Sequence, residues 1–164
     1  TSSPLRDELE HWNEVTSMRY QQFLEAVTAL ELEDANRHLT LFASMLDSNM
    51  SFITQRLDDI KNDTTKDEPD GIKMIRADHM ILGRTCKMVE EALLQLINLA
   101  DPATLRSEMV LRLDIFVRLN NILRQHQLRQ HDSLFPLLEL AIDTEKERSL
   151  TDLLTKAMQR SRPH

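Results

Sequence analysis

The chain contains little glycine and proline, with 2 glycines and 5 prolines in 164 residues. Few residues are therefore suited to turns, while Leu, Glu, Arg, Gln, Met and Ala, which favour helices, are frequent. A chain of this length is typical of one domain with a single core, which needs no disulfide or metal for stability. The composition predicts an all-α fold in one compact domain.

Cysteine is nearly absent, since Cys86 is the only one. It cannot form a disulfide within the chain, and its place on an apolar helical stripe favours a buried hydrophobic role over a nucleophilic one. The sequence also lacks a run of about 18 apolar residues. Its N-terminus lacks the basic, apolar and small-residue order of a signal peptide. We therefore expect a cytoplasmic protein without a membrane partner.

Positive charge is in the minority, because 20 Lys and Arg residues against 27 Asp and Glu residues give a formal net charge of −7. An acidic average surface repels nucleic acid and anionic lipid, so neither is the expected partner. Signatures of catalysis are missing too: the sequence has no glycine-rich phosphate loop and no Ser-His-Asp order that helical periodicity would assemble. We expect a protein that is not an enzyme and that binds a protein partner or a second copy of itself.

Apolar residues recur at alternating steps of three and four in four segments, the pattern of amphipathic helices. Two of the joints between these segments are short, which makes sequential helices antiparallel neighbours. We therefore predict an up-down-up-down four-helix bundle over residues 1–143, with helices at about 4–30, 34–61, 69–99 and 102–142. Pro136 is expected to disturb the last of these helices. Residues 144–164 are predicted to form a short C-terminal helix and tail.

Polar residues interrupt the apolar stripes at Asn49, His79, His126 and Gln130. If the first two helices turn near residue 32, Asn49 lies level with Thr16. If the last two turn near residue 102, His126 faces His79. One core layer then collects the polar set Thr16, Arg19, Asn49, His79, His126 and Gln130. Unpaired buried polar groups cost roughly 1 to 3 kcal/mol each, so these side chains are expected to bond one another, water or an ion.

The segment RLDIFVRLNNILRQHQLRQHDSLFPLLE resembles the fourth helix of hemerythrin-like domains. Those domains are four-helix bundles that hold a non-haem diiron centre, with a His-x-x-x-Glu element followed by a bulky residue and Phe-Pro. By this resemblance His126 occupies the position of the ligand histidine, and His79 that of the third-helix histidine. The resemblance covers most of residues 5–142, and it implies the same bundle with a metal site at His79 and His126.

The ligand set of that family is incomplete in this sequence. Gln130 stands where the resemblance implies a bridging Glu, Asn49 where it implies a second-helix His, and Ile53 where it implies the other Glu. Iron needs anionic oxygen ligands to offset its charge, and these residues supply none. We therefore expect no cofactor and a non-catalytic domain for binding, sensing or regulation. A titrating pair of His79 and His126 would make it responsive to pH.

Two alternatives remain open. The first is a metal-binding or oxygen-binding hemerythrin-like protein that carries non-haem iron or another transition metal. A site for Zn or Cu would use His79, His126, water and a nearby carboxylate such as Asp78 or Asp132. The second is a dimerising or partner-binding scaffold in which the polar layer only fixes the register of the helices.

Overall fold

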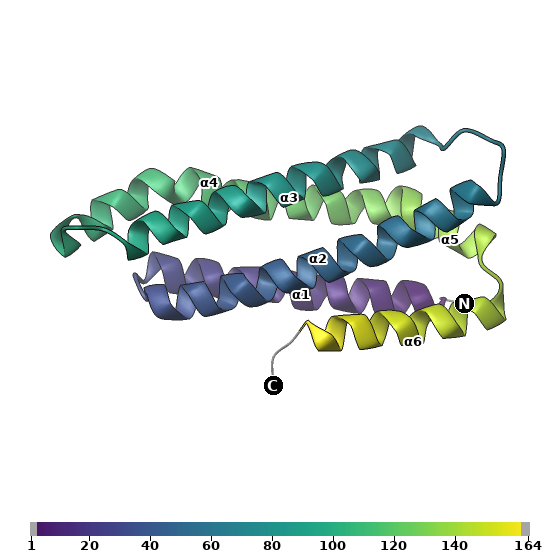
Figure 1. Ribbon diagram of the computed structural model, residues 1–164, viewed down its shortest axis with the longest axis horizontal. Coiled ribbons are helices and arrows are strands. Elements are labelled where there is room, and N and C mark those ends of the chain that lie inside the picture. Colours follow the sequence, from purple (N-terminus) through teal and green to yellow (C-terminus); the bar gives the residue numbers. More distant parts are fainter. Residues whose placement is uncertain (1–2, 162–164) are drawn as a thin grey trace.

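The computed structural model describes residues 3–161, and within that range the chain forms helices and no strands (Figure 1). This confirms the predicted all-α class. The long helices are α1 (Pro4–Thr28), α2 (Leu32–Asn62), α3 (Asp70–Ile97) and α4 (Leu105–Arg129). The remaining helices are α5 (Phe135–Ala141) and α6 (Thr144–Arg160). Residues 162–164 of the predicted tail lie outside the described residues. Among the described helices, none combines the length and hydrophobicity needed to span a bilayer.

Local chemistry accounts for the first helix and the turn that follows it. Ser3 caps α1 by accepting a hydrogen bond from the backbone N–H of Arg6, and Pro4 occupies the first turn. α1 ends at Thr28, and Leu30 leaves the helical region with φ at 62°. The N–H of Glu31 then bonds back to the carbonyl of Ala26 at 2.9 Å. This closure turns the chain sharply into α2.

The helix predicted over residues 102–142 is divided into several parts. It begins with a short 3₁₀ turn at Pro102–Thr104, continues as α4, widens into a π-helical segment at Gln130–Leu134, and ends as α5. Pro136 has no N–H to donate to the preceding turn, which explains why the regular pattern fails just before it. The π-helical segment lies close to α3 at Gly71, where an added Cβ would be 2.8 Å from the Cβ of Ser133. Gly71 is therefore needed for this close approach.

The long helices lie along the longest axis of the molecule in two pairs, α1 against α2 and α3 against α4 (Figure 1). The two pairs meet through α2 with α3 and α1 with α4. The core falls into two apolar clusters. One holds Tyr20, Phe42 and Phe116, and the other holds Trp12, Ile75 and Phe135. The buried polar residues Asn49, Asp78, His126 and Gln130 belong to neither cluster.

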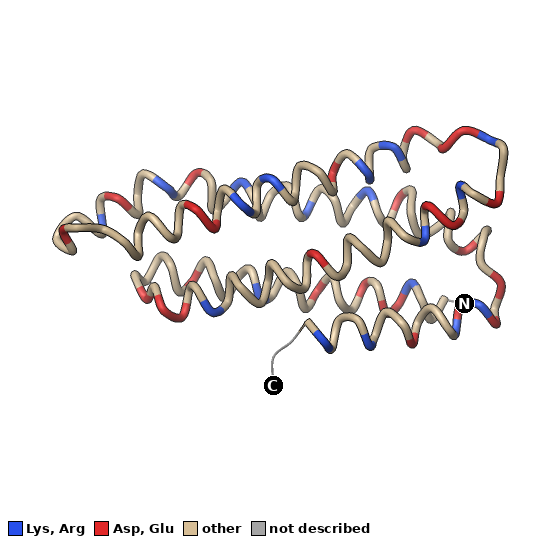
Figure 2. Tube along the Cα trace, in the orientation of Figure 1, with Lys and Arg blue, Asp and Glu red and all other residues tan. Residues whose placement is uncertain are grey.

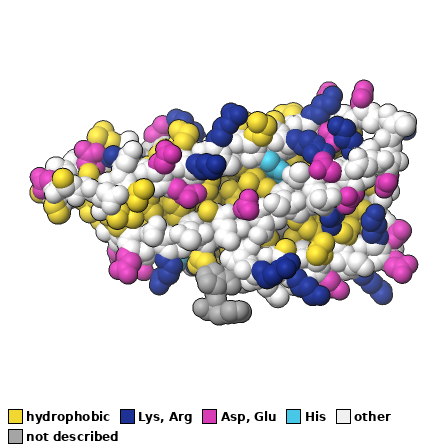
Figure 3. Space-filling view, in the orientation of Figure 1, with side chains coloured by type: hydrophobic (Ala, Val, Ile, Leu, Met, Phe, Trp, Pro, Cys, Tyr) yellow, Lys and Arg dark blue, Asp and Glu magenta, His cyan; other side chains and the backbone are white. Residues whose placement is uncertain are grey.

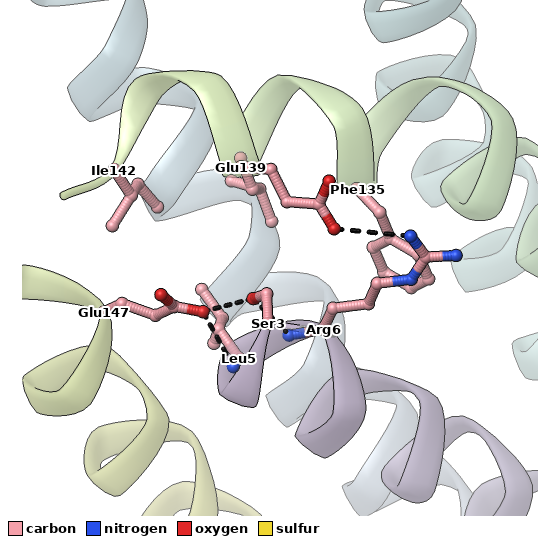
Figure 4. A pocket seen from close by; sticks show the side chains of 8 residues that line it. Ser3, Leu5, Arg6, Phe135, Glu139, Ile142 and Glu147 are labelled. Atoms are coloured by element: carbon pink, nitrogen blue, oxygen red, sulfur yellow. Dashed lines mark hydrogen bonds and ion pairs between the residues drawn. The ribbon is translucent and has the colours of Figure 1, made fainter. Parts of the chain in front are cut away.

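The C-terminal helix α6 packs on α1 and α2 through Leu150, Leu154 and Met158. Its start is held at the N-terminus of α1, where the carboxylate of Glu147 accepts hydrogen bonds from the Ser3 hydroxyl and the Leu5 N–H (Figure 4). Nearby, Arg6 reaches across to Glu139 of α5 at 3.3 Å (Figure 4). The predicted C-terminal helix is therefore present, and it covers one side of the first helix pair.

Candidate functional site

The structure brings His79 of α3 and His126 of α4 together in the interior. Their ring centroids are 5.0 Å apart, and the ring planes meet edge to face at 71°. His126 is buried, whereas His79 is partly exposed. The register argument from the sequence therefore placed these two side chains at the correct level, although His79 sits closer to the surface than its place on the apolar stripe indicates.

A chain of hydrogen bonds runs through His126. The amide nitrogen of Asn13 donates to the Gln130 oxygen at 2.6 Å, and the Gln130 amide nitrogen is 2.9 Å from Nε2 of His126. An amide NH₂ group only donates, so Nε2 of His126 accepts. The proton of the neutral imidazole is then on Nδ1, which lies 3.2 Å from a carboxylate oxygen of Asp78. Asn13 therefore donates to Gln130, Gln130 donates to His126, and His126 donates to Asp78.

Asp78 receives a second set of hydrogen bonds from Arg129. The guanidinium donates from Nε to one carboxylate oxygen at 2.7 Å and from Nη2 to the other at 3.1 Å. Asp78 is buried, while about a third of the Arg129 side chain is exposed. The arginine therefore reaches in from the surface, and it supplies the positive charge that a buried carboxylate needs. We call Asn13, Asp78, His126, Arg129 and Gln130 the core network.

The surroundings keep both imidazoles neutral at neutral pH. Burial and, to a smaller extent, the neighbouring His126 together lower the pKa of His79 to about 4. Burial also lowers the pKa of His126, and the opposing hydrogen bond to Asp78 does not overcome this effect. Burial alone would raise the pKa of Asp78, but the hydrogen bonds from Arg129 and His126 outweigh it and leave that pKa below its usual value. The network thus holds one anion and one cation.

Two other predicted members of the layer leave polar atoms without partners. Nδ1 of His79 lies 3.1 Å from the Thr54 hydroxyl, but its Nε2 is buried and has no hydrogen-bond partner among the described residues. The amide nitrogen of Asn49 is buried without a partner within that same part of the chain. These atoms lie outside the core network, so the predicted layer is only partly joined by hydrogen bonds.

The hydrogen bond of Thr16 and the contact of Arg19 with His38 reach residues outside the core network. The hydroxyl of Thr16 donates to the carbonyl of Trp12 one turn earlier in its own helix, at 2.7 Å. The guanidinium of Arg19 lies 3.0 Å from Nδ1 of His38 on α2. Thr16 is buried as expected, but helical Thr often satisfies its hydroxyl in this local way.

The residues present do not fit a diiron centre. Both nitrogens of His126 and both oxygens of Asp78 are engaged within the network. Gln130 offers a neutral amide, and Ile53, at the position of the other expected carboxylate, lies in the apolar core. The donor set therefore lacks the negative charge that iron needs. In residues 3–161, no group of three or more His, Cys, Asp and Glu side chains is arranged around a common point for a metal.

Sequence reasoning overlooked the roles of Asp78, Arg129 and Asn13. The sequence indicates Asp78 only as an extra metal ligand, although the register that pairs His79 with His126 also brings its neighbour Asp78 to that level. Arg129 was overlooked because arginine next to a buried stripe usually faces solvent. No protein-family model, curated protein or solved structure gave a significant match to the chain.

Proposed function

We propose that this chain is a non-catalytic binding and regulatory domain built as an antiparallel, hemerythrin-like four-helix bundle. In this proposal a hydrogen-bonded network takes the place that a metal centre has in that family. The observation that carries it is the state of His126, whose two ring nitrogens are engaged by Asp78 and Gln130. A histidine held in this way stabilises the packing of α3 on α4 and has no free lone pair for a metal or for proton transfer to a substrate.

A sensing role is supported for acidic conditions rather than for neutral pH. His79, with a pKa of about 4, and His126, with a lowered pKa, both take up protons only when the surroundings become acidic. Protonation of His126 would change its bond to Gln130, because Nε2 would then carry a proton and face the amide NH₂. Acid would thus loosen the joint between α4 and the π-helical segment.

A metal-binding role is the second candidate, and one observation favours it. The buried Nε2 of His79 has no partner among the described residues, and the His79 ring packs edge to face against the ring of His126. An unpaired imidazole nitrogen is the kind of donor that Zn²⁺ or Cu²⁺ accepts. This role would require the Gln130 amide to turn away from His126, so that both imidazoles could face one ion.

Elemental analysis separates the two candidates. Iron, manganese, zinc and copper per chain are measured on untagged protein purified without chelators, and on the His79→Ala, His126→Ala double variant. The binding domain predicts no stoichiometric metal in either protein. One or two metal ions per chain in the wild type, lost in the double variant, would overturn the proposal and establish a metal site with unusual ligands. The exposed His131→Ala variant is the control, because this side chain lies on the surface.

A further inference from the structure

The exposed face of α3 differs in character from the rest of this acidic chain. In the described stretch from Lys73 to Met88, the exposed residues are all apolar or cationic: Lys73, Met74, Ala77, Met80, Ile81, Arg84, Lys87 and Met88. We call them the α3 outer face. The only carboxylate in this stretch is Asp78, which is buried and paired with Arg129. This face therefore lacks negative charge over about four turns, although the chain carries a net charge of −7.

The large apolar side chains on this face are exposed to solvent and are not packed into the core. Ile81 is 45% exposed and Met80 is 61% exposed, with Met74 and Met88 between these values. Several such side chains on one surface are typical of a place where another molecule binds. Methionine is common at surfaces that receive helices, because its flexible side chain adapts to the shape of the partner.

The spacing on the α3 outer face is that of a helix-binding seam. Met74, Ile81 and Met88 recur at steps of seven, and Ala77 and Arg84 fill the positions between them. Alternating steps of three and four place these five residues in one row, as in the contact seam of a coiled coil. A second row, Lys73, Met80 and Lys87, also repeats every seven residues and runs beside the first. This row occupies a flanking position at which charged residues select the partner.

The cations of this face are available to a partner. Arg76 and Arg129 are paired with carboxylates of the chain itself, whereas Lys73, Arg84 and Lys87 form no ion pair with the part of the chain that the structure describes. On the neighbouring helix, the exposed residues from Val117 to His131 again include no carboxylate. Figures 2 and 3 show Lys and Arg residues over the middle of the α3 and α4 pair. A partner would meet positive charge beside the apolar seam.

We infer that the α3 outer face docks an acidic amphipathic helix of a partner protein, with its apolar side chains on Met74, Ile81 and Met88 and its carboxylates against Lys73, Arg84 and Lys87. The occupant follows from charge complementarity and from the heptad spacing, which suits a helix better than a flat surface. A lipid surface is disfavoured, because this face contains no aromatic side chain and the acidic remainder of the chain is repelled by anionic headgroups. The inference deepens the proposed binding role and rests on it.

The test uses the full chain and a labelled synthetic helix of about four turns, with Leu at the seam positions and Glu at the flanking positions. A peptide of the same composition in scrambled order is the control. Binding is followed by fluorescence anisotropy at low and high salt. The inference predicts binding of the amphipathic peptide alone, and weaker binding at high salt because the charged contacts are screened. Equal binding of the two peptides, or binding of neither, would overturn it.

Variants locate the binding face. Ile81→Glu and the double variant Lys73→Glu, Lys87→Glu should each weaken peptide binding by about tenfold or more. The matched controls lie on α6: Leu153→Glu, which replaces a side chain that is 44% exposed, and the double variant Lys146→Glu, Lys156→Glu. They should leave affinity within about twofold. Circular dichroism checks that every variant is folded. Equal losses in the α3 variants and the α6 controls would contradict the assignment of this face.

Two further experiments test whether the α3 outer face binds something other than a partner helix. Loss of binding to vesicles containing phosphatidylserine in the Lys73→Glu, Lys87→Glu variant would overturn the inference in favour of a lipid surface. Self-association in sedimentation experiments, abolished by Ile81→Glu, would overturn it in favour of a second copy of the chain. Failure of peptide binding by a chain that contains no metal would refute only the partner chemistry. Stoichiometric metal bound by His79 and His126 would refute the proposed function. It would not change the interpretation of peptide binding to the α3 outer face.

Discussion

Gln130 and His126 lie one helical turn apart, with the amide nitrogen of Gln130 2.9 Å from Nε2 of the imidazole. Because the amide donates, it keeps the proton of neutral His126 on Nδ1, where it bonds to Asp78. A glutamate at position 130 would accept a hydrogen bond instead of donating one, so it would favour a proton on Nε2 as well. The identity of one side chain thus determines which nitrogen of His126 is protonated.

The Gln130→Glu variant should raise the pKa of His126. The new carboxylate would accept from Nε2 while Asp78 still accepts from Nδ1, so both nitrogens would carry protons and the imidazolium would be favoured. NMR titration of the His126 ring measures the change. The matched control is Gln127→Glu on the same helix, whose side chain is only half-buried. An unchanged His126 pKa in the Gln130 variant would contradict the hydrogen-bond order described above.

Asp78→Asn should lower the free energy of unfolding by about 1 to 3 kcal/mol, because it removes the charge that Arg129 and His126 share. Arg129 is partly exposed and can turn to water, which limits the loss. Urea denaturation measures the difference. In the control, Asp114→Asn, the lost partner is exposed Arg118, and a change below about 0.5 kcal/mol is expected. Equal losses in the free energy of unfolding would show that the buried ion pair stabilises the fold no more than the exposed one.

The free energy of unfolding should fall as the pH is lowered from about 6.5 to about 4. Over this range the unfolded chain, with a His pKa near 6.5, binds a proton that folded His79 does not bind. This contribution to the free energy of unfolding is therefore complete above pH 6.5. It is lost as the pH approaches about 4, the pKa of His79 in the folded protein. The total loss is about 3 kcal/mol. The depressed pKa of Asp78 adds a further loss at lower pH.

Denaturation curves at a series of pH values test this dependence. The His79→Leu variant should show a flatter profile than the wild type, since it no longer gains a proton on unfolding. The His131→Leu variant is the control for replacing an exposed histidine. A wild-type profile that is level between pH 4 and 6.5 would rule out a buried neutral His79.

Asn49→Leu should increase the free energy of unfolding by about 1 kcal/mol. Its buried amide nitrogen has no partner among the described residues, so replacing it with an apolar side chain removes a desolvation penalty. Gln130→Leu is the contrasting variant, and it should destabilise the fold because it removes a bonded amide. Size-exclusion chromatography and hydrogen exchange are measured together with stability. A change of oligomeric state in Asn49→Leu would support the scaffold alternative, in which the residue fixes helix register.

Cys86 should resist thiol reagents in the folded protein. Burial and the nearby Glu90 raise the pKa of its thiol to about 12, so almost no thiolate is present at neutral pH. Modification is followed with a chromogenic disulfide reagent in buffer and in urea. Rapid reaction is expected only in urea. Rapid reaction in buffer would show that the thiol is accessible and would weaken its interpretation as a core residue.

The sequence by itself determined the helical class, the four long amphipathic segments and the C-terminal helix. These follow from local properties: few glycines and prolines, the cap at Ser3, and apolar residues repeating with the period of a helix. It also brought His79 and His126 to one level, because a short joint between the last two long helices fixes their register to within about a turn.

Only the tertiary structure decided which polar side chains bond to one another. Asp78 and Arg129 are neighbours of predicted layer residues, and small rotations of α3 and α4 decide whether they meet in the interior or face solvent. The π-helical segment before Pro136 shifts the following residues around the helix, and no local periodicity records that shift. Hydrogen-bond partners depend on angstrom-scale distances between helices, whereas the sequence pattern fixes only the face of each helix and its approximate height.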